Sequence, residues 1–578
     1  MIRLSVSSIL FLLATVNCDV VLEERGYLQL PNRENNLVFD SGTAKESAID
    51  TTRRILYVIG EQTAMMHVID LSNVDTLNTI LTYNFNLATE GKPLDVEYCS
   101  SALGSYVAVS FESTQHPQAE GHIILYRPVT VGQPSLAPIN PADPSITVGP
   151  HPDNIKFTSD CSKLVVSNEG IPGTVENNFV DPPGSVDVVV ITSPTSSTVE
   201  RASFSFVDDT DKTLELLNAG VRWMVRANFD TNEINPFSNN IEPEYIAISP
   251  NDAYAYVTLQ ENNAIAQISL ESYTVANIYP LGSKEWKYST LDASDMDSGK
   301  YLKKHDISSF YQPDKIAFFE WKEKLYLITA DEGKQFNIPV YFYTDSMLAR
   351  NLHANGDFLV DPALAAELAN DTELGRYFVS QFHDGRVSGK IRTVYGFGGR
   401  GFSVLNPSTM TREWESGDEI EKFNRLFYPD VFNGDCTDEN LTPFQEKDKL
   451  STSTGPSLNA IIDGEFNGRK LIVVASGTNG LIYLYELSST VANAELMFQS
   501  VHRRGGTIDT WGRLYSSGNI GDAGIEDMSW IPIEHSPVAG SPVLVVVSST
   551  SGSVSAYTLT ERQFPHGQNG NGAICQQP

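Results

Sequence analysis

The chain has 578 residues, and its hydrophobic fraction of 41% is high enough to build a large packed core and to exclude a disordered protein. Its 40 basic and 72 acidic residues give a formal charge of −32, which disfavours binding to nucleic acid or to anionic membranes and favours cations or basic partners. Solubility alone also explains such a charge, so the charge by itself names no partner.

The first 18 residues, MIRLSVSSILFLLATVNC, predict a secretory signal peptide, with Arg3 before an apolar core from Ile9 to Val16. No other stretch approaches the roughly 20 apolar residues of a membrane span, and the last residues show no apolar tail of the kind a lipid-anchor signal uses. We therefore expect a secreted, extracellular protein with no membrane span or lipid anchor. Residues 19–565 are expected to form one domain, and residues 566–578 a flexible tail.

The cysteines and glycosylation sequons fit the extracellular compartment. Removal of residues 1–18 leaves four cysteines, which predict two disulfides in one of three connectivities: Cys99, Cys161, Cys436 and Cys575. Asn370 (NDT) and Asn440 (NLT) are candidate glycan acceptors, although such triplets also occur by chance. Neither feature names a function.

A strand-like segment recurs along the chain, each time alternating toward a final Leu, Ile or Val. The seven copies are AMMHVIDLS (from Ala64), GHIILYRPV (Gly121), GSVDVVVIT (Gly184), NAIAQISLE (Asn263), RGFSVLNPS (Arg400), GLIYLYELS (Gly480) and GSVSAYTLT (Gly552). Two apolar runs joined by a turn precede each copy, as in NIKFTSDCSKLVVS, so the unit is a meander of at least three strands. Seven such units around an axis predict an all-β, seven-bladed β-propeller.

The spacing between these segments, from 57 to 137 residues, predicts long inter-strand loops. The largest gap holds an insertion over about residues 334–393, where DPALAAELAND predicts a helix with Pro362 at its first position. Near the N-terminus, GYLQL (Gly26 to Leu30) is expected to complete the last blade and close the ring.

The blade alignment also selects one disulfide pairing. Cys99 lies in the turn of the second unit (EYCSSALGSY) and Cys161 in the equivalent turn of the third (TSDCSKL), so adjacent blades place them side by side. We predict a Cys99–Cys161 disulfide, which leaves Cys436 to pair with Cys575.

Three units share acidic groups at matching positions. A proline-flanked group opens the first strand (HPDN, EPEY, QPDK), and an acidic group ends the second (VVSNEG, TLQENN, LITADEG). Two antiparallel strands joined by a turn place the opening and the ending at the same end. The sequence therefore predicts one acidic rim, on which Asp153 lies near Glu169, Glu242 and Glu244 near Glu261, and Asp314 near Asp331 and Glu332.

Clustered carboxylates repel one another unless a cation lies between them. Calcium, which takes about 6–8 oxygen ligands in irregular geometry, is the expected ion. The alternative is that these residues only cap strand ends and turns. LDASDMDSG is a weaker calcium candidate through Asp292, Asp295 and Asp297; it lacks the EF-hand pattern, and an Asp-rich turn is the preferred interpretation.

Common catalytic motifs are absent from the sequence. Gly396 to Gly401 reads GFGGRG but leads into the strand FSVLN, so it is interpreted as a turn and not as a nucleotide-binding loop. No G-x-S-x-G, HExxH, Cys-x-x-Cys or P-loop pattern occurs. A calcium-dependent phosphohydrolase stays open as an alternative, and would need Lys, Arg or His converging beside the carboxylates. A propeller that binds proteins through its loops is a third interpretation.

Several motifs together, in this order and spacing, resemble the mesenchyme-specific cell surface glycoprotein family, also called the choice-of-anchor I domain. They are HPDNIKFTSDCSKLVVSNEG, EPEYIAISPNDAYAYVTLQENN, YQPDKIAFF with LYLITADEG, and YGFGGRGFSVLN. The resemblance implies an extracellular protein; animal members are associated with calcium carbonate biomineralisation, and some bacterial relatives are labelled alkaline phosphatase. We expect a secreted acidic glycoprotein of a shell or skeletal matrix, calcium-associated and non-catalytic, with calcium carbonate mineral and matrix proteins as partners.

The last two units depart from the family pattern. They read TGPSLNA with ASGTNG and GIEDMSW with SSTSG, and so are expected to lack the acidic openings and endings. If family members bind cations around the whole rim, this chain should bind fewer.

Overall fold

Seven antiparallel sheets of four strands contain most of the strands in the described part of the chain. The computed structural model describes residues 19–354, 359–360, 362–382, 386–387, 390–391, 393–491 and 493–562. Blades 1 to 3 consist of β2 (Glu46–Asp50), β3 (Ile55–Gly60), β4 (Met65–Asp70) and β5 (Asn78–Asn84); β6 (Pro93–Ser101), β7 (Gly104–Phe111), β8 (Glu120–Tyr126) and β9 (Ser145–Pro150); and β10 (Pro152–Phe157), β11 (Lys163–Asn168), β14 (Ser185–Ser193) and β15 (Ser196–Ser203).

Blades 4 to 7 follow the same plan. They consist of β16 (Ile246–Ile248), β17 (Tyr254–Leu259), β18 (Ala264–Ser269) and β19 (Thr274–Pro280); β22 (Ile316–Trp321), β23 (Lys324–Asp331), β32 (Gly401–Leu405) and β33 (Arg412–Glu415); β34 (Leu458–Phe466), β35 (Arg469–Ser476), β36 (Leu481–Leu487) and β37 (Leu496–Arg503); and β38 (Ile525–Ile531), β39 (Val543–Ser548), β40 (Ser553–Arg562) and β1 (Asp19–Gln29).

The inner strands of the seven sheets form a closed ring. In chain order β2, β6, β10, β16, β22, β34 and β38 each contact the next, and β38 contacts β2 again. Each of the seven recurring segments is the third strand of its blade. The predicted seven-bladed β-propeller is therefore confirmed.

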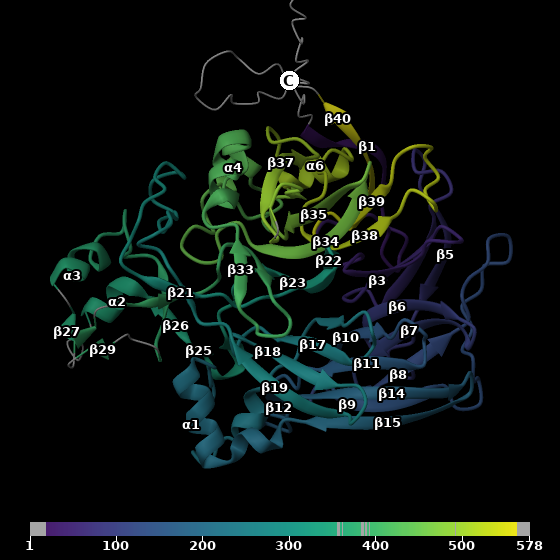
Figure 1. Cartoon of the computed structure of the whole chain (residues 1–578), viewed down its shortest axis with the longest axis horizontal. Coiled ribbons are helices and arrows are strands. Elements are labelled where there is room, and N and C mark those ends of the chain that lie inside the picture. Colours follow the sequence, from purple (N-terminus) through teal and green to yellow (C-terminus); the bar gives the residue numbers. More distant parts are fainter. Residues whose placement is uncertain are drawn as a thin grey trace, which may run out of the picture.

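The N-terminal strand closes the ring. β1 pairs with β40 from Asp19↔Arg562 to Gln29↔Ser553 and so becomes the outer strand of blade 7; the two strands lie side by side at one edge of the molecule (Figure 1). The prediction from GYLQL is confirmed, although the strand begins earlier, at Asp19. β1 therefore covers the edge of β40, which the last blade would otherwise expose.

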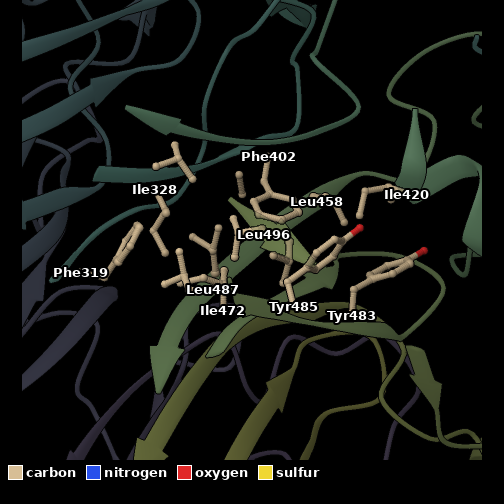
Figure 2. Close-up of a cluster of buried hydrophobic side chains, with 14 of the residues drawn as sticks. Phe319, Ile328, Phe402, Ile420, Leu458, Ile472, Tyr483, Tyr485, Leu487 and Leu496 are labelled. Carbon is tan, nitrogen blue, oxygen red and sulfur yellow. The ribbon is translucent and has the colours of Figure 1, made fainter. Parts of the chain in front are cut away.

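The core lies between neighbouring blades, where both faces of a sheet are covered. Accordingly every residue of β39 is buried, and no polar alternation is visible in that strand. Figure 2 shows the layer between blades 5 and 6, closed by the helix α4 (Glu419–Phe427). Its labelled side chains are Phe319, Ile328, Phe402, Ile420, Leu458, Ile472, Tyr483, Tyr485, Leu487 and Leu496.

The insertion in blade 5 packs with the loop that precedes it. Trp286, Leu291 and Ile307 share one apolar core with Leu364 and Tyr377, so residues 283–310 belong to the same unit as the predicted insertion. α2 (Ala349–Ala354) and α3 (Pro362–Leu368) lie together at one side of the ring (Figure 1), and α3 confirms the predicted helix. The strands of this unit are β20 (Ser283–Glu285), β21 (Ser308–Phe310), β24 (Asn337–Ile338), β25 (Tyr343–Thr344), β26 (Ser346–Leu348), β27 (Leu359–Val360), β28 (Phe378–Ser380), β29 (Arg386–Val387), β30 (Lys390–Ile391) and β31 (Tyr395–Gly396).

Other loops carry short elements. They are β12 (Gly173–Val175), β13 (Asn178–Val180), α1 (Thr210–Ala219), α5 (Pro443–Glu446) and α6 (Trp511–Ser516). No helix in the described ranges has the length and apolar character needed to cross a membrane. Asn370 and Asn440 of the two sequons are exposed. The predicted signal peptide, residues 1–18, lies outside the described residues.

A disulfide joins blades 2 and 3. Cys99 of β6 is bonded to Cys161, in the turn between β10 and β11, as the blade alignment predicts. Cys436 is buried with its Sγ 3.5 Å from Thr550 Oγ1, and its predicted partner Cys575 lies outside the described residues.

The double change Cys99→Ser with Cys161→Ser is expected to lower the free energy of unfolding by about 2–4 kcal/mol, because it frees a loop in the unfolded chain. The loop spans 62 residues. Urea unfolding of the two proteins under non-reducing conditions measures the difference. An unchanged midpoint would contradict the prediction, and addition of a reductant should bring the wild type to the variant's midpoint.

Candidate cation site at one end of the propeller axis

A β-bulge opens the inner strands and turns consecutive side chains toward the axis. In β10, Pro152 pairs with Asn168 and Asn154 with Ser167, so Asp153 is the extra residue. In blade 5, the N–H of Asp314 donates to the carbonyl of Ala330, and the N–H of Ala330 donates to the carbonyl of Lys315, so two residues face one. A bulge leaves its extra residue outside the ladder and re-aims its side chain. The bulge residues of five blades are charged and ring one end of the axis: Lys45, Asp153, Glu244, Asp314 and Glu526.

Polar contacts cross the axis just below this ring. Tyr245 of blade 4 donates through its hydroxyl to Glu46 of blade 1, at 2.9 Å. Lys315 Nζ of blade 5 lies 3.0 Å from Glu46 and 3.6 Å from Asp527 of blade 7. Blades 1 and 4 lie on opposite sides of a seven-membered ring, so these bonds span its centre. The acidic rim therefore sits above a layer of polar contacts.

The structure brings together most of the rim residues that the sequence pairs. His151 Nε2 lies 3.4 Å from Glu169 and 3.8 Å from Asp153. Burial, followed by the charge of Glu332, raises the pKa of Asp314 well above its ordinary value. Glu332 also accepts hydrogen bonds from Ser457 at 2.7 Å and from Gln260 at 3.2 Å.

Asp331 is the exception. Its carboxylate accepts hydrogen bonds from the hydroxyls of Thr329, at 2.8 Å, and Ser403, both within blade 5. Burial raises its pKa to about 6, and Arg412 opposes the shift. Successive side chains of a strand point to opposite sides. LITADEG therefore contributes Glu332 to the rim, and the prediction that Asp331 joins it is wrong.

Lys334 is a rim residue that sequence reasoning missed. Its Nζ lies 3.0 Å from Glu244 Oε1 and 2.7 Å from Glu261 Oε1. Burial lowers the pKa of Lys334, but the carboxylates of Glu244, Glu261 and Glu169 raise it by more than burial lowers it. The pKa therefore lies well above its ordinary value, and the ammonium group stays charged. Its only signal in the sequence is its place directly after LITADEG. Lys334 brings a positive charge to a position where the sequence predicted a metal ion.

Lys334 does not satisfy all of the surrounding carboxylates. Three of their oxygens are buried and have no hydrogen-bond partner among the described residues: Glu242 Oε1, Glu244 Oε2 and Glu261 Oε2. Glu169, Glu242 and Glu261 each offer one oxygen within 4.8 Å of the others. A pocket of about 350 Å³ opens beside them, lined also by Lys334 and Phe336. Buried polar atoms are normally paired, so this set of hard oxygen donors fits a divalent cation such as calcium.

Burial and neighbouring charges shift the pKa values of the rim carboxyl groups. Burial raises the pKa of Glu169 to about 7, while His151 and Lys334 lower it. Burial and the neighbouring Glu261 raise the pKa of Glu242 well above its ordinary value, and Glu244 is raised in the same direction. Burial and mutual repulsion therefore disfavour the charged forms of these carboxyl groups, and a cation between them would offset both effects.

Blade 7 corrects one expectation from the sequence. Glu526, from GIEDMSW, occupies the bulge position, and burial raises its pKa to about 7 while Lys45 opposes the shift. Its carboxylate accepts hydrogen bonds from Ser549 at 2.7 Å and from Asn459 of blade 6 at 3.3 Å. The acidic ring is therefore not confined to the earlier blades.

The three aspartates of LDASDMDSG do not act as one group. Asp295 forms a bidentate ion pair with Arg376, which donates to both of its carboxylate oxygens. Asp292 and Asp297 instead meet Asp448, which lies far away in the sequence. Burial, followed by the charges of Asp448 and Asp297, raises the pKa of Asp292 to about 9.

Residues 45–490 match the Choice-of-anchor I domain, which covers most of the chain. The chain belongs to the choice-of-anchor I family. The family resemblance predicted from the motifs is confirmed. This choice-of-anchor I chain is 29% identical over 317 residues to "Mesenchyme-specific cell surface glycoprotein" of Strongylocentrotus purpuratus, covering 49% of the chain and 39% of that protein. It is 32% identical over 193 residues to "Gigasin-3a" of Magallana gigas, covering 33% of the chain and 66% of that protein.

The matched regions thus span less than two thirds of either relative of the choice-of-anchor I chain. Among solved structures, hydrazine synthase of Kuenenia stuttgartiensis aligns with 91% of the chain and 97% of its own, at 9% identity and a TM-score of 0.42. Sqt1 of Saccharomyces cerevisiae aligns with 93% of the chain and 99% of its own, at 7% identity and a TM-score of 0.41. These likenesses say nothing about ligands.

Proposed function

We propose that the chain is a secreted, glycosylated propeller of an extracellular, calcium carbonate-associated matrix, and that its acidic rim binds calcium without catalytic turnover. Membership of the choice-of-anchor I family, and the description of one relative as a cell surface glycoprotein, support the extracellular placement. The observation that carries the calcium proposal is the set of three buried carboxylate oxygens without partners, on Glu242, Glu244 and Glu261.

Calcium binding requires the Lys334 side chain to move away from Glu244 and Glu261. Its side chain is 44% exposed, whereas those of Glu244 and Glu261 are 5% and 2% exposed, so the lysine can rotate toward solvent while the carboxylates stay in place. A calcium ion would then bind the oxygens that Lys334 contacts as well as those without partners. The chain's negative charge of −32 favours the approach of calcium and of a calcium-bearing mineral surface.

One observation favours the phosphohydrolase alternative. Lys334 and His151 do lie beside the rim carboxylates, as phosphate binding would require. Both groups are already engaged, however, because Lys334 contacts Glu244 and Glu261 and His151 contacts Glu112 at 3.2 Å. The surrounding carboxylates outnumber them and repel phosphate, so the calcium-binding matrix protein is the better supported function.

The double change Glu242→Gln with Glu261→Gln tests this proposal. The wild type is expected to bind calcium and to gain thermal stability from it, because a ligand that binds only the folded state stabilises it. Removing two ligand charges should weaken binding at the rim at least about tenfold, a loss of about 1.4 kcal/mol. Calorimetric titration of chelator-treated protein with calcium chloride measures the binding, and thermal unfolding with and without calcium measures the stabilisation.

The matched control is Glu271→Gln, an exposed glutamate outside the rim, which should leave calcium binding unchanged. Calcium carbonate growth in the presence of each protein should be altered by the wild type and by the control, and less by the rim variant. Steady hydrolysis of a phosphate monoester that the rim variant loses would establish the enzymatic alternative instead.

A further inference from the structure

We propose a second calcium site, away from the axis, formed by Asp292, Asp297 and Asp448. Asp292 and Asp297 lie in the loop between β20 and β21, and Asp448 lies between α5 and β34. One carboxylate oxygen from each residue lies within 4.8 Å of the other two. The site therefore links the inserted unit of blade 5 to the segment that leads into blade 6.

Asp292 points to a missing ligand. The residue is only 1% exposed, and its Oδ2 is buried with no hydrogen-bond partner in the described chain. Its other oxygen accepts a hydrogen bond from the Ser294 N–H at 3.2 Å. A buried carboxylate oxygen facing two further carboxylates is unfavourable unless a cation joins them.

The other two carboxylates are held in position by their own loops. Asp448 accepts hydrogen bonds from the Gly299 N–H at 2.7 Å and from the Ser451 hydroxyl at 2.6 Å. Asp297 accepts one from the Lys300 N–H at 2.9 Å. The loop of residues 292–300 thus wraps around Asp448, and binding of an ion would order few additional groups.

Charge compensation is missing at this cluster. Within the described ranges, none of the three carboxylates forms an ion pair with a lysine, arginine or histidine, whereas Asp295 of the same loop pairs with Arg376. Arg400 lies nearby, but it bonds to the backbone carbonyl of Asp292 and not to its carboxylate.

The ligand set selects the class of ion. Three carboxylates with no cysteine or histidine favour a hard cation over zinc or copper. Calcium accepts irregular sets of oxygen ligands completed by carbonyls or water, whereas magnesium demands a near-ideal octahedron. Calcium bound here would join the loop of residues 292–300 to residues 447–457 and hold the inserted unit against the ring.

The test uses a double variant that carries both Asp297→Asn and Asp448→Asn. Its control is the single variant Asp295→Asn. The control removes a carboxylate from the same loop that is already paired with Arg376. Calorimetric titration of chelator-treated protein with calcium chloride should show one ion fewer in the double variant and an unchanged stoichiometry in the control. Asp297→Asn alone, at a partly exposed position, serves if the double variant does not fold.

Amide hydrogen exchange locates the effect. In the wild type, calcium should slow exchange in residues 292–300 and 447–457, and this protection should be lost in the site variants. The same measurement in the Glu242→Gln, Glu261→Gln background separates this site from the rim, since protection should persist there. Unchanged stoichiometry in a folded Asp297→Asn protein, or exchange in residues 447–457 that calcium leaves unaltered, overturns the proposal.

Discussion

Replacing Arg400 with methionine is expected to lower the free energy of unfolding by about 3–5 kcal/mol, the usual cost of removing one partner of a buried ion pair. Arg400 is 1% exposed and lies 3.0 Å from Glu421 Oε1. It also donates to three backbone carbonyls, those of Asp292, Ser451 and Ser453. Methionine fills much of the volume, but it leaves the buried Glu421 carboxylate without a counter-charge, with only the Asn433 amide donating to it at 2.7 Å, and it removes the donor to these carbonyls.

Urea unfolding monitored by tryptophan fluorescence measures this loss. Arg513→Met, at a side chain that is 78% exposed, is the matched control and should stay within about 0.5 kcal/mol of the wild type. Arg400→Lys should recover only part of the stability, because one ammonium group cannot reach carbonyls on both sides as the planar guanidinium does. A wild-type midpoint for Arg400→Met would show that the bonds of Arg400 to Asp292, Ser451 and Ser453 do not stabilise the fold.

Removing β1, residues 19–29, is expected to lower the free energy of unfolding by more than about 5 kcal/mol. That loss is comparable with the whole stability of many folded proteins. Val20 and Leu22 are at most 5% exposed, and their burial against blades 6 and 7 would be lost. Deletion would also leave β40 as an unpaired edge carrying the apolar Leu559. We therefore expect low yields of monomer, aggregation, and a strongly lowered melting temperature.

Adding the missing strand separately sharpens this test. A peptide of residues 19–30 should restore part of the melting temperature of the shortened chain in proportion to its concentration, because it can pair with β40. A peptide of the same composition in scrambled order is the control and should restore nothing. If the shortened chain had the same melting temperature as the wild type, ring closure would not depend on β1.

The repeated strand unit, the number of blades and the strand that closes the ring could all be predicted from the sequence. These features follow from alternation of apolar residues and from turns, which are local signals, and seven copies of one local signal leave few other ways to bury them. The Cys99–Cys161 pair could be predicted for the same reason, because equivalent turns of adjacent blades must be neighbours. The acidic rim was predictable in outline, since antiparallel strands bring Asp153 to Glu169.

The charges that meet at the two candidate sites could not be predicted in the same way, because they come together only in the folded chain. Asp331 and Glu332 are adjacent in the sequence, yet one faces the interior of blade 5 and the other the rim, because strand side chains alternate in direction. Lys334 and Asp448 carry no motif, and each meets partners that lie far from it in the sequence. Ion pairing and cation binding depend on distances of a few ångströms across blades, which local periodicity does not encode.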